Sequence, residues 1–558
     1  MFVNGGGGCG HGGDMIARSI EDTPRTLGRR GRAECASQPV RPFVVRGNSP
    51  VTVIVGRDVL VYRNIMLTRL RVIGFKNLVD VEMHFGAFTC VAGANAVGKS
   101  NLFDAIRFLS LLADHKLDEA ARSIRAEDVA QGDVRSLFTR VGDSEPGTME
   151  FDMDIIVPKR ATDELGQEGE ASTTLLNYRL EIAYRAKLED RRQLGEMELR
   201  REDLNYLKTA DAAKHLKFPS RPEWQKSVIA GVRTKPLIST VTRGDETLIV
   251  LRQDGVAREG RGKKRGTGYE RIARQLPRTL LSVGDADSPT VLCARSEMRR
   301  WELLQLEPSA MRGSDSLHQS PALDATGAHL AATLYNLARI PMVPGGKPNP
   351  DAVYQRVSNH LAELLGEVWQ VGVDVDERRE LLTLFLKDRN GVTIPARSLS
   401  DGTLSFIALV LKQMEAGGQG LLCMEEPENG IHPRRIPAIL DLLQEIAVDT
   451  NLAVDEANPL RQVIINTHSP AVVQQVPEGS LIVAERVPAL SQEKKLFEKL
   501  AFKVLPESWR SKVIPPPPVV TKGSLLAYLR PTPRKKVAGA SERRRVVDSL
   551  YVRDLFEP

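Results

Sequence analysis

The residues with the clearest chemical potential form one run, Gly93-Ala94-Asn95-Ala96-Val97-Gly98-Lys99-Ser100. This run has the glycine and lysine spacing of a loop that holds the phosphates of a nucleotide. It follows a strand-like stretch at 88–92 and precedes an amphipathic stretch at 101–109, which is the strand–loop–helix context that such a loop requires. Glycine lets backbone N–H groups close around phosphate oxygens, and the helix N-terminus adds partial positive charge.

Several positions of this run have an expected task. Lys99 would reach the terminal phosphates, and the Ser100 hydroxyl would ligate Mg²⁺. The other residues that we expect to line the phosphate site are Gly93, Asn95, Gly98 and Asn101. We therefore predict that the chain binds a nucleoside triphosphate, ATP or GTP, together with Mg²⁺.

A second chemical feature lies where the apolar stretch 421–424 ends in two adjacent carboxylates, Glu425 and Glu426. Two acids at a strand end repel each other unless a cation or a water network occupies the site. The carboxyl ends of parallel strands are also where such a sheet presents its ligands. We expect Glu425 to orient the Mg²⁺ shell and Glu426 to accept the proton of an attacking water. The alternative is a solvated pair of acids at a strand end.

Two further polar turns complete the set. The apolar stretch 463–465 leads into Asn466-Thr467-His468-Ser469-Pro470, and we expect His468 to sense or polarise the γ-phosphate. The segment Leu399-Ser400-Asp401-Gly402-Thr403 precedes a clear helical pattern at 404–414. Taken alone, this segment fits a simple helix cap equally well. The turn at 428–433 is one that a partner subunit could touch.

The composition is that of an ordinary globular protein, 42% apolar and 27% charged over 558 residues. No stretch approaches the about 18 uninterrupted apolar residues of a membrane span, so we expect no membrane contact. The five cysteines are scattered and odd in number, which favours reduced thiols and a cytoplasmic location. The net charge of +6 permits contact with nucleic acid but does not argue for it. Basic runs at 258–265 and 534–545 are more often solvated than binding surfaces.

The organisation along the chain follows from shifts in pattern. Alternating stretches at 149–157 and 178–184, and a hairpin pattern at 238–251, indicate strands, whereas helical periodicity prevails from about 268 to 370. No heptad pattern is sustained, so no long coiled-coil arm is expected. The expected segments are a disordered Gly/Arg-rich extension (1–65), an N-terminal lobe with the phosphate loop and an antiparallel β subdomain (66–260), a mainly helical insert (261–390), a C-terminal lobe (391–488) and a Pro-rich basic tail (489–558).

In their order, the phosphate loop, the Ser400 segment, the run from Glu425 to Pro433 and the His468 turn resemble the SMC/RecF-like branch of ABC-type ATPases. More narrowly, they resemble bacterial AAA-family ATPases, including ATPase subunits of anti-phage defence systems. The opening Gly-Phe-Lys-Asn-Leu at 74–78 fits that group too, and the resemblance covers 66–486. It implies an α/β fold: an ABC-type P-loop ATPase head with a mixed sheet, an antiparallel β subdomain and an inserted helical region.

The resemblance also implies a head-to-tail homodimer that holds ATP between two chains. Ser400 and Gly402 of one subunit would complete the γ-phosphate site formed by Gly98, Lys99 and Ser100 of the other. One departure is Glu425, since many ABC-type ATPases have Asp there. The glutamine loop of the family has no clear counterpart, and Gln131 is too weak a candidate to assign.

Three functions fit these motifs. The first is an ATP-hydrolysing conformational switch that acts on nucleic acid in DNA repair or anti-phage defence, where relatives work with a separate effector protein. The second is the ATPase subunit of a transporter, which the long segment between Ser100 and Leu399 disfavours. The third is an ATPase–nuclease of the overcoming-lysogenisation-defect (OLD) type, which the scattered acids of the last 70 or so residues disfavour. We expect the first.

Overall fold

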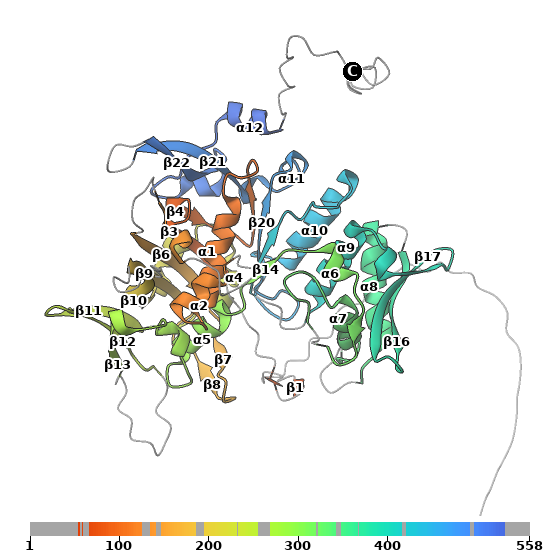
Figure 1. The fold of residues 1–558 in the computed structure, drawn as a ribbon, viewed down its shortest axis with the longest axis horizontal. Coiled ribbons are helices and arrows are strands. Elements are labelled where there is room, and N and C mark those ends of the chain that lie inside the picture. The colour runs from red at the N-terminus through yellow and green to blue at the C-terminus, as the bar shows by residue number, and fades with distance from the viewer. Residues whose placement is uncertain are drawn as a thin grey trace, which may run out of the picture. The chain divides into compact units, whose positions relative to one another are not determined.

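The computed structural model describes residues 54–55, 58–59, 66–124, 134–140, 147–185, 195–231, 233–254, 268–319, 322–341, 347–365, 368–415, 420–490 and 496–529. Chain contacts divide the protein into Met1–Val51 and Thr52–Pro558, and every element below belongs to the second unit (Figure 1). The predicted extension at 1–65 lies outside the described residues, except for the paired strands β1 (Ile54–Val55) and β2 (Asp58–Val59). Gln131 and both basic runs also lie outside them. No helix in the described ranges is long and apolar enough to cross a membrane.

A six-stranded sheet lies at the centre of this unit. Its order is β14 (Glu302–Leu304), β19 (Leu421–Glu425), β20 (Gln462–Thr467), β5 (Phe88–Ala92), β21 (Leu481–Leu490) and β22 (Leu496–Val504). All neighbours are parallel except β21 and β22, which form an antiparallel hairpin. Every residue of β5 and β20 is buried, as expected for parallel strands covered on both faces. The strand that precedes the phosphate loop therefore lies among strands from the far end of the chain.

An eight-stranded antiparallel sheet forms from the first half of the chain. Its order is β13 (Tyr269–Ile272), β12 (Glu246–Leu251), β11 (Ile238–Arg243), β10 (Glu196–Tyr206), β9 (Leu175–Arg185), β6 (Thr148–Ile156), β3 (Met66–Phe75) and β4 (Leu78–His84). The predicted strands at 149–157 and 178–184 are confirmed as β6 and β9, and the predicted hairpin as β11 and β12. The structure thus has the predicted α/β class, with a mixed sheet and an antiparallel β subdomain.

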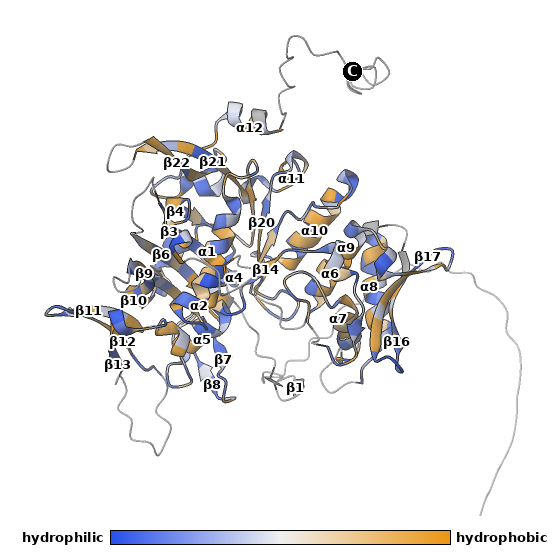
Figure 2. Cartoon of the chain, viewed as in Figure 1, coloured by the Kyte–Doolittle hydropathy of each residue, from blue (hydrophilic) through white to orange (hydrophobic). Residues whose placement is uncertain are grey.

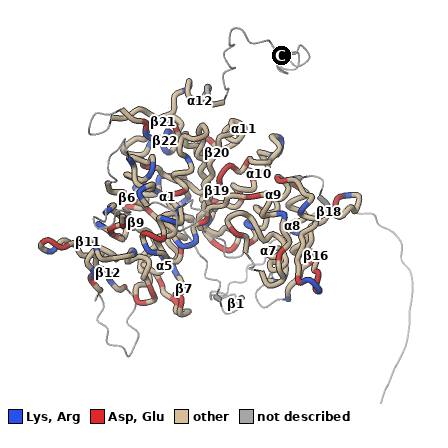
Figure 3. Tube along the Cα trace, in the orientation of Figure 1, with Lys and Arg blue, Asp and Glu red and all other residues tan. Residues whose placement is uncertain are grey.

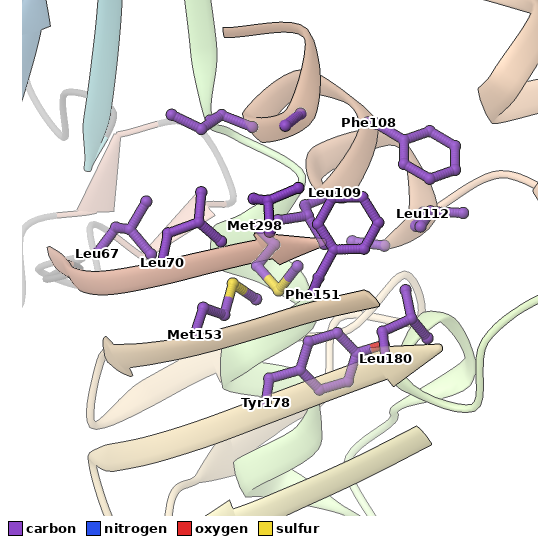
Figure 4. Close-up of a cluster of buried hydrophobic side chains, with 14 of the residues drawn as sticks. Leu67, Leu70, Phe108, Leu109, Leu112, Phe151, Met153, Tyr178, Leu180 and Met298 are labelled. Carbon is purple, nitrogen blue, oxygen red and sulfur yellow. The ribbon is translucent and has the colours of Figure 1, made fainter. Parts of the chain in front are cut away.

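Helix α1 (Lys99–Leu112) fills the space between these two sheets. Its side chains Phe108, Leu109 and Leu112 share one buried cluster with Met153 of β6 and Leu180 of β9 (Figure 4). The same cluster contains residues of β5, β19 and β20. Because α1 contacts both sheets, the sheets hold the start of the helix, and with it the phosphate loop, in place.

The other face of the six-stranded sheet packs against a helical layer. This layer contains α7 (Leu330–Leu337), α8 (Pro350–Leu365), α9 (Asp401–Met414) and α10 (Ile436–Ile446). Most residues of α10 are hydrophobic (Figure 2), and its buried residues recur at helical spacing from Ile436 to Ile446. Alternation along β19 sends Leu421 and Cys423 to one cluster and Leu422 and Met424 to the other, which is the period of two expected for a strand.

The segment 261–390, predicted to be mainly helical, also contains strands. Its helices are α5 (Pro289–Met298), α6 (Pro308–Met311), α7 and α8. Besides β13 and β14 it contributes β15 (Asp315–Ser316), β16 (Val368–Asp376) and β17 (Leu381–Asp388), which form a small sheet with β18 (Thr393–Pro395). Short apolar runs fit either a helix or a strand, and here pairing in the hairpin of β16 and β17 selects the strands.

The tail predicted at 489–558 is in part structured. Its proposed start lies inside β21, and the described residues beyond include β22 and α12 (Lys522–Leu529). Pairing of β22 with β21 explains why the sheet continues past the predicted boundary. The remaining elements are α2 (Leu117–Arg122), α3 (Ala212–His215), α4 (Pro222–Val228), α11 (Pro470–Val473) and the paired strands β7 (Arg160–Thr162) and β8 (Glu168–Glu170).

Candidate nucleotide site

The phosphate loop joins β5 to α1, as predicted. Gly98 caps the helix with φ 107°, a left-handed conformation that favours glycine. A Cβ atom on Gly98 would lie 2.0 Å from Asn77 Nδ2, and one on Gly93 would lie 2.6 Å from the Ala484 carbonyl O. Both glycines are therefore required by close packing. The first N–H groups of a helix lack partners further back in the helix, so the start of α1 is suited to bind a phosphate.

Two residues that the sequence did not single out brace this loop. Asn77, in the turn between β3 and β4, donates to the Val97 carbonyl O at 3.0 Å and accepts from Asn101 Nδ2 at 2.8 Å. The Arg486 guanidinium, from β21, donates to the Ala96 carbonyl O. Asn77 belongs to the Gly-Phe-Lys-Asn-Leu opening that supports the family resemblance, which is a usable signal. No local pattern marks Arg486.

Lys99 lies buried beneath the loop that it follows. Its Nζ donates to the carbonyl oxygens of Gly93 and Ala94, at 2.8 and 3.0 Å. Burial lowers the pKa of Lys99, and the negative charges of Glu426, Glu428 and Glu425 oppose that shift. The ammonium group therefore lies within electrostatic reach of the acidic cluster. Its charge is one that a bound anionic ligand would further stabilise.

The strand register brings the acidic pair, the histidine turn and the phosphate loop to one edge of the sheet. In β19 and β20, Glu425 pairs with Asn466, and in β20 and β5, Thr467 pairs with Ala92. Strand order β19, β20, β5 thus puts Glu426 and His468 beside Gly93. These are the carboxyl ends of parallel strands, where ligands of such sheets bind.

Glu426 is held through both its backbone and its carboxylate. Its backbone N–H donates to the Asn466 carbonyl O at 3.0 Å. Its carboxylate lies 2.8 Å from His468 Nδ1 and accepts a hydrogen bond from Asn429 Nδ2 at 3.0 Å. Glu426 also has a positive φ of 46°. The histidine and the asparagine fix the carboxylate of the residue predicted to be the general base.

A third carboxylate, Glu428, is a part of the site that sequence reasoning missed. Its side chain is only 8% exposed, and Oε1 accepts a hydrogen bond from the Thr467 hydroxyl. Its other oxygen, Oε2, is buried without a hydrogen-bond partner. Burial raises the pKa of Glu428, and the bond from Thr467 opposes this shift. The signal was present as the last acid of Glu-Glu-Pro-Glu, but only the fold shows that it points inward.

Ser400 and Gly402 lie at the start of α9. The Ser400 hydroxyl accepts from the Thr403 N–H at 3.2 Å, so the helix cap considered from the sequence exists. A Cβ on Gly402 would lie 3.1 Å from the Gly430 carbonyl O, which shows that this segment packs on the turn after the acidic strand. In the described part of the chain, no hydrogen bond joins Ser400 or Gly402 to the phosphate loop. The structure therefore does not bring these two residues together with Gly98, Lys99 and Ser100.

The donors near the loop suit Mg²⁺ that arrives with a nucleotide. Among the residues that the structure describes, no group of three or more His, Cys, Asp or Glu side chains could hold a metal by itself. Mg²⁺ in nucleotide sites usually takes one or two protein oxygens, with phosphates and waters as its other ligands. The Ser100 hydroxyl at the start of α1 and the Glu425 carboxylate at the end of β19 are two such oxygens. The residues present fit this ion.

Comparisons with known proteins agree with this site. The family model described as "AAA domain, putative AbiEii toxin, Type IV TA system" matches residues 88–234 and 352–474. The DNA replication and repair protein RecF, from two strains of Bacteroides fragilis, is 46% identical over 46 residues. That stretch is 8% of this chain and 12% of RecF, so the chain spans a small part of the length of these curated relatives.

Solved structures of SMC heads give weaker likenesses. The Smc head bound to the C-terminal winged-helix domain of ScpA has 12% identity and a TM-score of 0.39, over 79% of this chain and 98% of that one. The Smc head from Pyrococcus furiosus, bound to the C-terminal domain of ScpA, has the same identity and score over 79% and 96%. The SMC head from Thermotoga maritima has 11% identity and a TM-score of 0.32 over 79% and 99%. Because all three scores lie below 0.5, they carry no weight in the assignment.

The two segments matched by the family model include the strands β5, β19 and β20. Those strands carry the phosphate loop, the acidic pair and His468, and the register makes them neighbours. The match therefore covers the residues that the fold gathers at one sheet edge. The match to this family model and the short match to RecF support a P-loop ATPase similar to the SMC/RecF-like group.

Proposed function

We propose that this protein binds ATP with Mg²⁺ and hydrolyses the ATP to ADP and phosphate. The observation that supports this most is the Glu426 carboxylate, which His468 and Asn429 hold at the edge where the phosphate loop begins. A carboxylate fixed in this way is suited to accept a proton from water. Burial of Lys99 under the same loop adds a cation for the phosphates.

The reaction follows from these positions. The oxygen of a water molecule forms a bond to the γ-phosphorus, and its proton passes to Glu426. The bond between the γ-phosphorus and the bridging oxygen breaks, and ADP leaves. Lys99 and the N–H groups of the loop neutralise charge on the phosphates, and His468 contacts the γ-phosphate. Mg²⁺, held by Ser100 and Glu425, would supply further charge neutralisation.

We also propose that two copies of the chain close over ATP. Ser400 and Gly402 have no hydrogen bond to their own phosphate loop within the described ranges, while Ser400 is exposed at a helix start. A helix start directed at solvent is suited to bind the γ-phosphate on a second copy. Hydrolysis would then open the pair, so the protein would act as a conformational switch.

We propose nucleic acid as the target of this switch, in repair or in anti-phage defence with a separate effector protein. A cavity of about 480 Å³ lies on the eight-stranded sheet, on β3, β4, β6, β9 and β10. Its charged lining comprises the cations Arg69, Arg71, Arg179, Lys214 and Lys217 and the acids Glu82, Asp152 and Asp154. Both signs of charge occur around β6 and β9 (Figure 3), and in the lining of the cavity the cations outnumber the acids. A gel-shift assay with duplex DNA, with and without a non-hydrolysable ATP analogue, tests this: no shift in either condition contradicts it.

The change Glu426→Gln tests the ATPase proposal. Gln keeps the size of the side chain but cannot accept the proton, so we expect ATP turnover to fall by about 100-fold or more while ATP binding persists. Phosphate release and binding of a fluorescent ATP analogue measure the two effects. Glu377→Gln, the same change at an exposed glutamate between β16 and β17, is the control and should leave turnover unchanged. Wild-type turnover in Glu426→Gln would remove Glu426 from the mechanism.

A further inference from the structure

The C-terminal helix α12 packs next to the start of the phosphate loop. Its side chains Leu525, Tyr528 and Leu529 pack on the buried cluster that contains Cys90 and Ala92 of β5. The chain leading to α12 is fixed, because Val504 at the end of β22 donates to the Pro518 carbonyl O and accepts from the Val520 N–H, both at 2.9 Å. A segment far from the motifs in sequence thus reaches the nucleotide site.

Tyr528 carries a polar atom into this apolar contact. Its hydroxyl oxygen is buried and makes no hydrogen bond. Burial raises the pKa of Tyr528, and the negative charge of Glu428 raises it further, so the hydroxyl keeps its proton. The Gly93 N–H lies near this oxygen and opposes the rise in the pKa of Tyr528. It donates its hydrogen bond to the Thr467 carbonyl O, at 3.2 Å.

A second unsatisfied oxygen lies in the same region. Glu428 Oε2 is buried without a hydrogen-bond partner, although the side chain is held at its other oxygen by Thr467. Thr467 donates to Glu428 and accepts from the Gly93 N–H, and the same N–H lies near the Tyr528 oxygen, so both side chains lie at the end of β20 and the start of the phosphate loop. Buried polar atoms in native proteins nearly always have a partner, and a water molecule often provides it. The Tyr528 hydroxyl is a donor and Glu428 Oε2 is an acceptor, and both lack a hydrogen-bond partner. One water molecule could bond to both.

We propose that Tyr528 is a positioning residue for hydrolysis, and that its hydroxyl and Glu428 Oε2 share one bridging water. This inference rests on the proposed ATPase function. Glu428 lies two residues after Glu426, whose positive φ is costly for a residue with a side chain. Anchoring Glu428 at both oxygens, through Thr467 and through Tyr528, holds this turn and keeps the Glu426 carboxylate aimed at the attacking water.

The change Tyr528→Phe tests this, because it removes the hydroxyl and keeps the ring that packs on β5. We expect kcat for MgATP hydrolysis to fall by about tenfold, the effect of one lost hydrogen bond, with KM for ATP unchanged. A change in packing alone would alter thermal stability or KM instead. Tyr354→Phe, the same change at a partly buried tyrosine of α8, is the matched control and should leave both constants unchanged.

A second measurement uses Glu428→Gln. If Tyr528 acts through Glu428, Tyr528→Phe has a smaller effect on kcat in this background than in the wild type. Equal effects in both backgrounds, or a wild-type kcat in Tyr528→Phe, would overturn the inference and leave the ATPase proposal intact. A wild-type protein without Mg²⁺-dependent hydrolysis would overturn both.

Discussion

Glu426 shows how single residues of this site are constrained. A positive φ costs about 1–3 kcal/mol for a residue with a Cβ atom. The Asn466 backbone, His468 and Asn429 compensate this cost by bonding the residue on three sides. In this conformation the Glu426 carboxylate contacts His468, which follows the neighbouring strand β20. Backbone strain of this kind is typical of residues in functional sites.

Gly98 is constrained by contact as well as by conformation. In Gly98→Ala, the new Cβ would lie 2.0 Å from Asn77 Nδ2, so the brace from Asn77 to Val97 must break and the loop must shift. We expect affinity for MgATP to fall by at least tenfold, measured by isothermal titration calorimetry.

Gly244→Ala is the control for this change. Gly244 also has a positive φ, 60°, but a Cβ atom added there would meet nothing within 4 Å. The substitution therefore adds backbone strain without a collision, far from the loop in the turn between β11 and β12. Equal losses of affinity in the two variants would show that the contact with Asn77 is unimportant.

At the scale of the elements, one buried side chain ties the two sheets together. Gln462, at the start of β20, accepts from the Leu67 N–H at 2.9 Å and donates to the carbonyl oxygens of Leu67 and Gly86, at 2.8 and 2.9 Å. Leu67 belongs to β3 of the antiparallel sheet. These bonds satisfy polar backbone groups where the sheets meet. They also help to fix the position of β20 along the direction of the neighbouring strand β5.

A buried acid in the antiparallel sheet gives a pH dependence to stability. Glu202 of β10 accepts from the N–H groups of Leu280 and Leu281 and from the Tyr178 hydroxyl, at 2.7, 2.8 and 3.1 Å. Burial nevertheless raises the pKa of Glu202 from 4.5 to about 7. Between these two values the folded protein holds a proton that the unfolded chain has released. The free energy of unfolding therefore falls as the pH rises through this window.

Glu202→Gln should remove this dependence, since glutamine does not titrate. We expect the unfolding free energy of the wild type, relative to Glu202→Gln, to fall by up to about 3 kcal/mol between pH 4.5 and pH 7. Urea unfolding at several pH values measures it, with Glu223→Gln, an exposed glutamate of α4, as the control. Parallel pH profiles for wild type and Glu202→Gln would contradict the raised pKa.

At the scale of the whole molecule, the proposed dimer makes a specific demand on Ser400. In Ser400→Arg, the long cationic side chain would project from the start of α9 and collide with the second copy of the chain in the proposed dimer. We expect the variant to bind MgATP as a monomer and to lose turnover, measured by phosphate release with Glu426 intact. Loss of dimerisation is measured by analytical ultracentrifugation with ATP in the Glu426→Gln background.

The control separates this effect from loss of the helix cap. Replacing a capping serine costs about 1 kcal/mol, whereas asparagine caps as well as serine does. Ser400→Asn should therefore retain stability and dimerise at least in part. Dimers of normal affinity in Ser400→Arg would show that α9 does not face a second copy.

Features that depend on residues close together in the chain could be predicted from the sequence. The phosphate loop was identifiable because its glycines, its lysine and the flanking strand and helix are contiguous. The hairpin of β11 and β12 and the cap at Ser400 were recognisable for the same reason. The Glu425–Glu426 pair was also visible locally, as acids that end an apolar strand.

Which distant residues meet depends on the packing of the whole fold. Asn77 and Arg486 bond to the phosphate loop from two separate segments, and Tyr528 packs on the cluster that contains β5. The sequence marks Asn77 as part of a motif, but it does not show that these three residues meet near the loop. Glu428 was visible as an acid, but its burial depends on how β19, β20 and α12 pack around it. Local patterns report periodicity and turn chemistry, whereas strand order and packing are set by contacts between segments hundreds of residues apart, and these contacts complete the site.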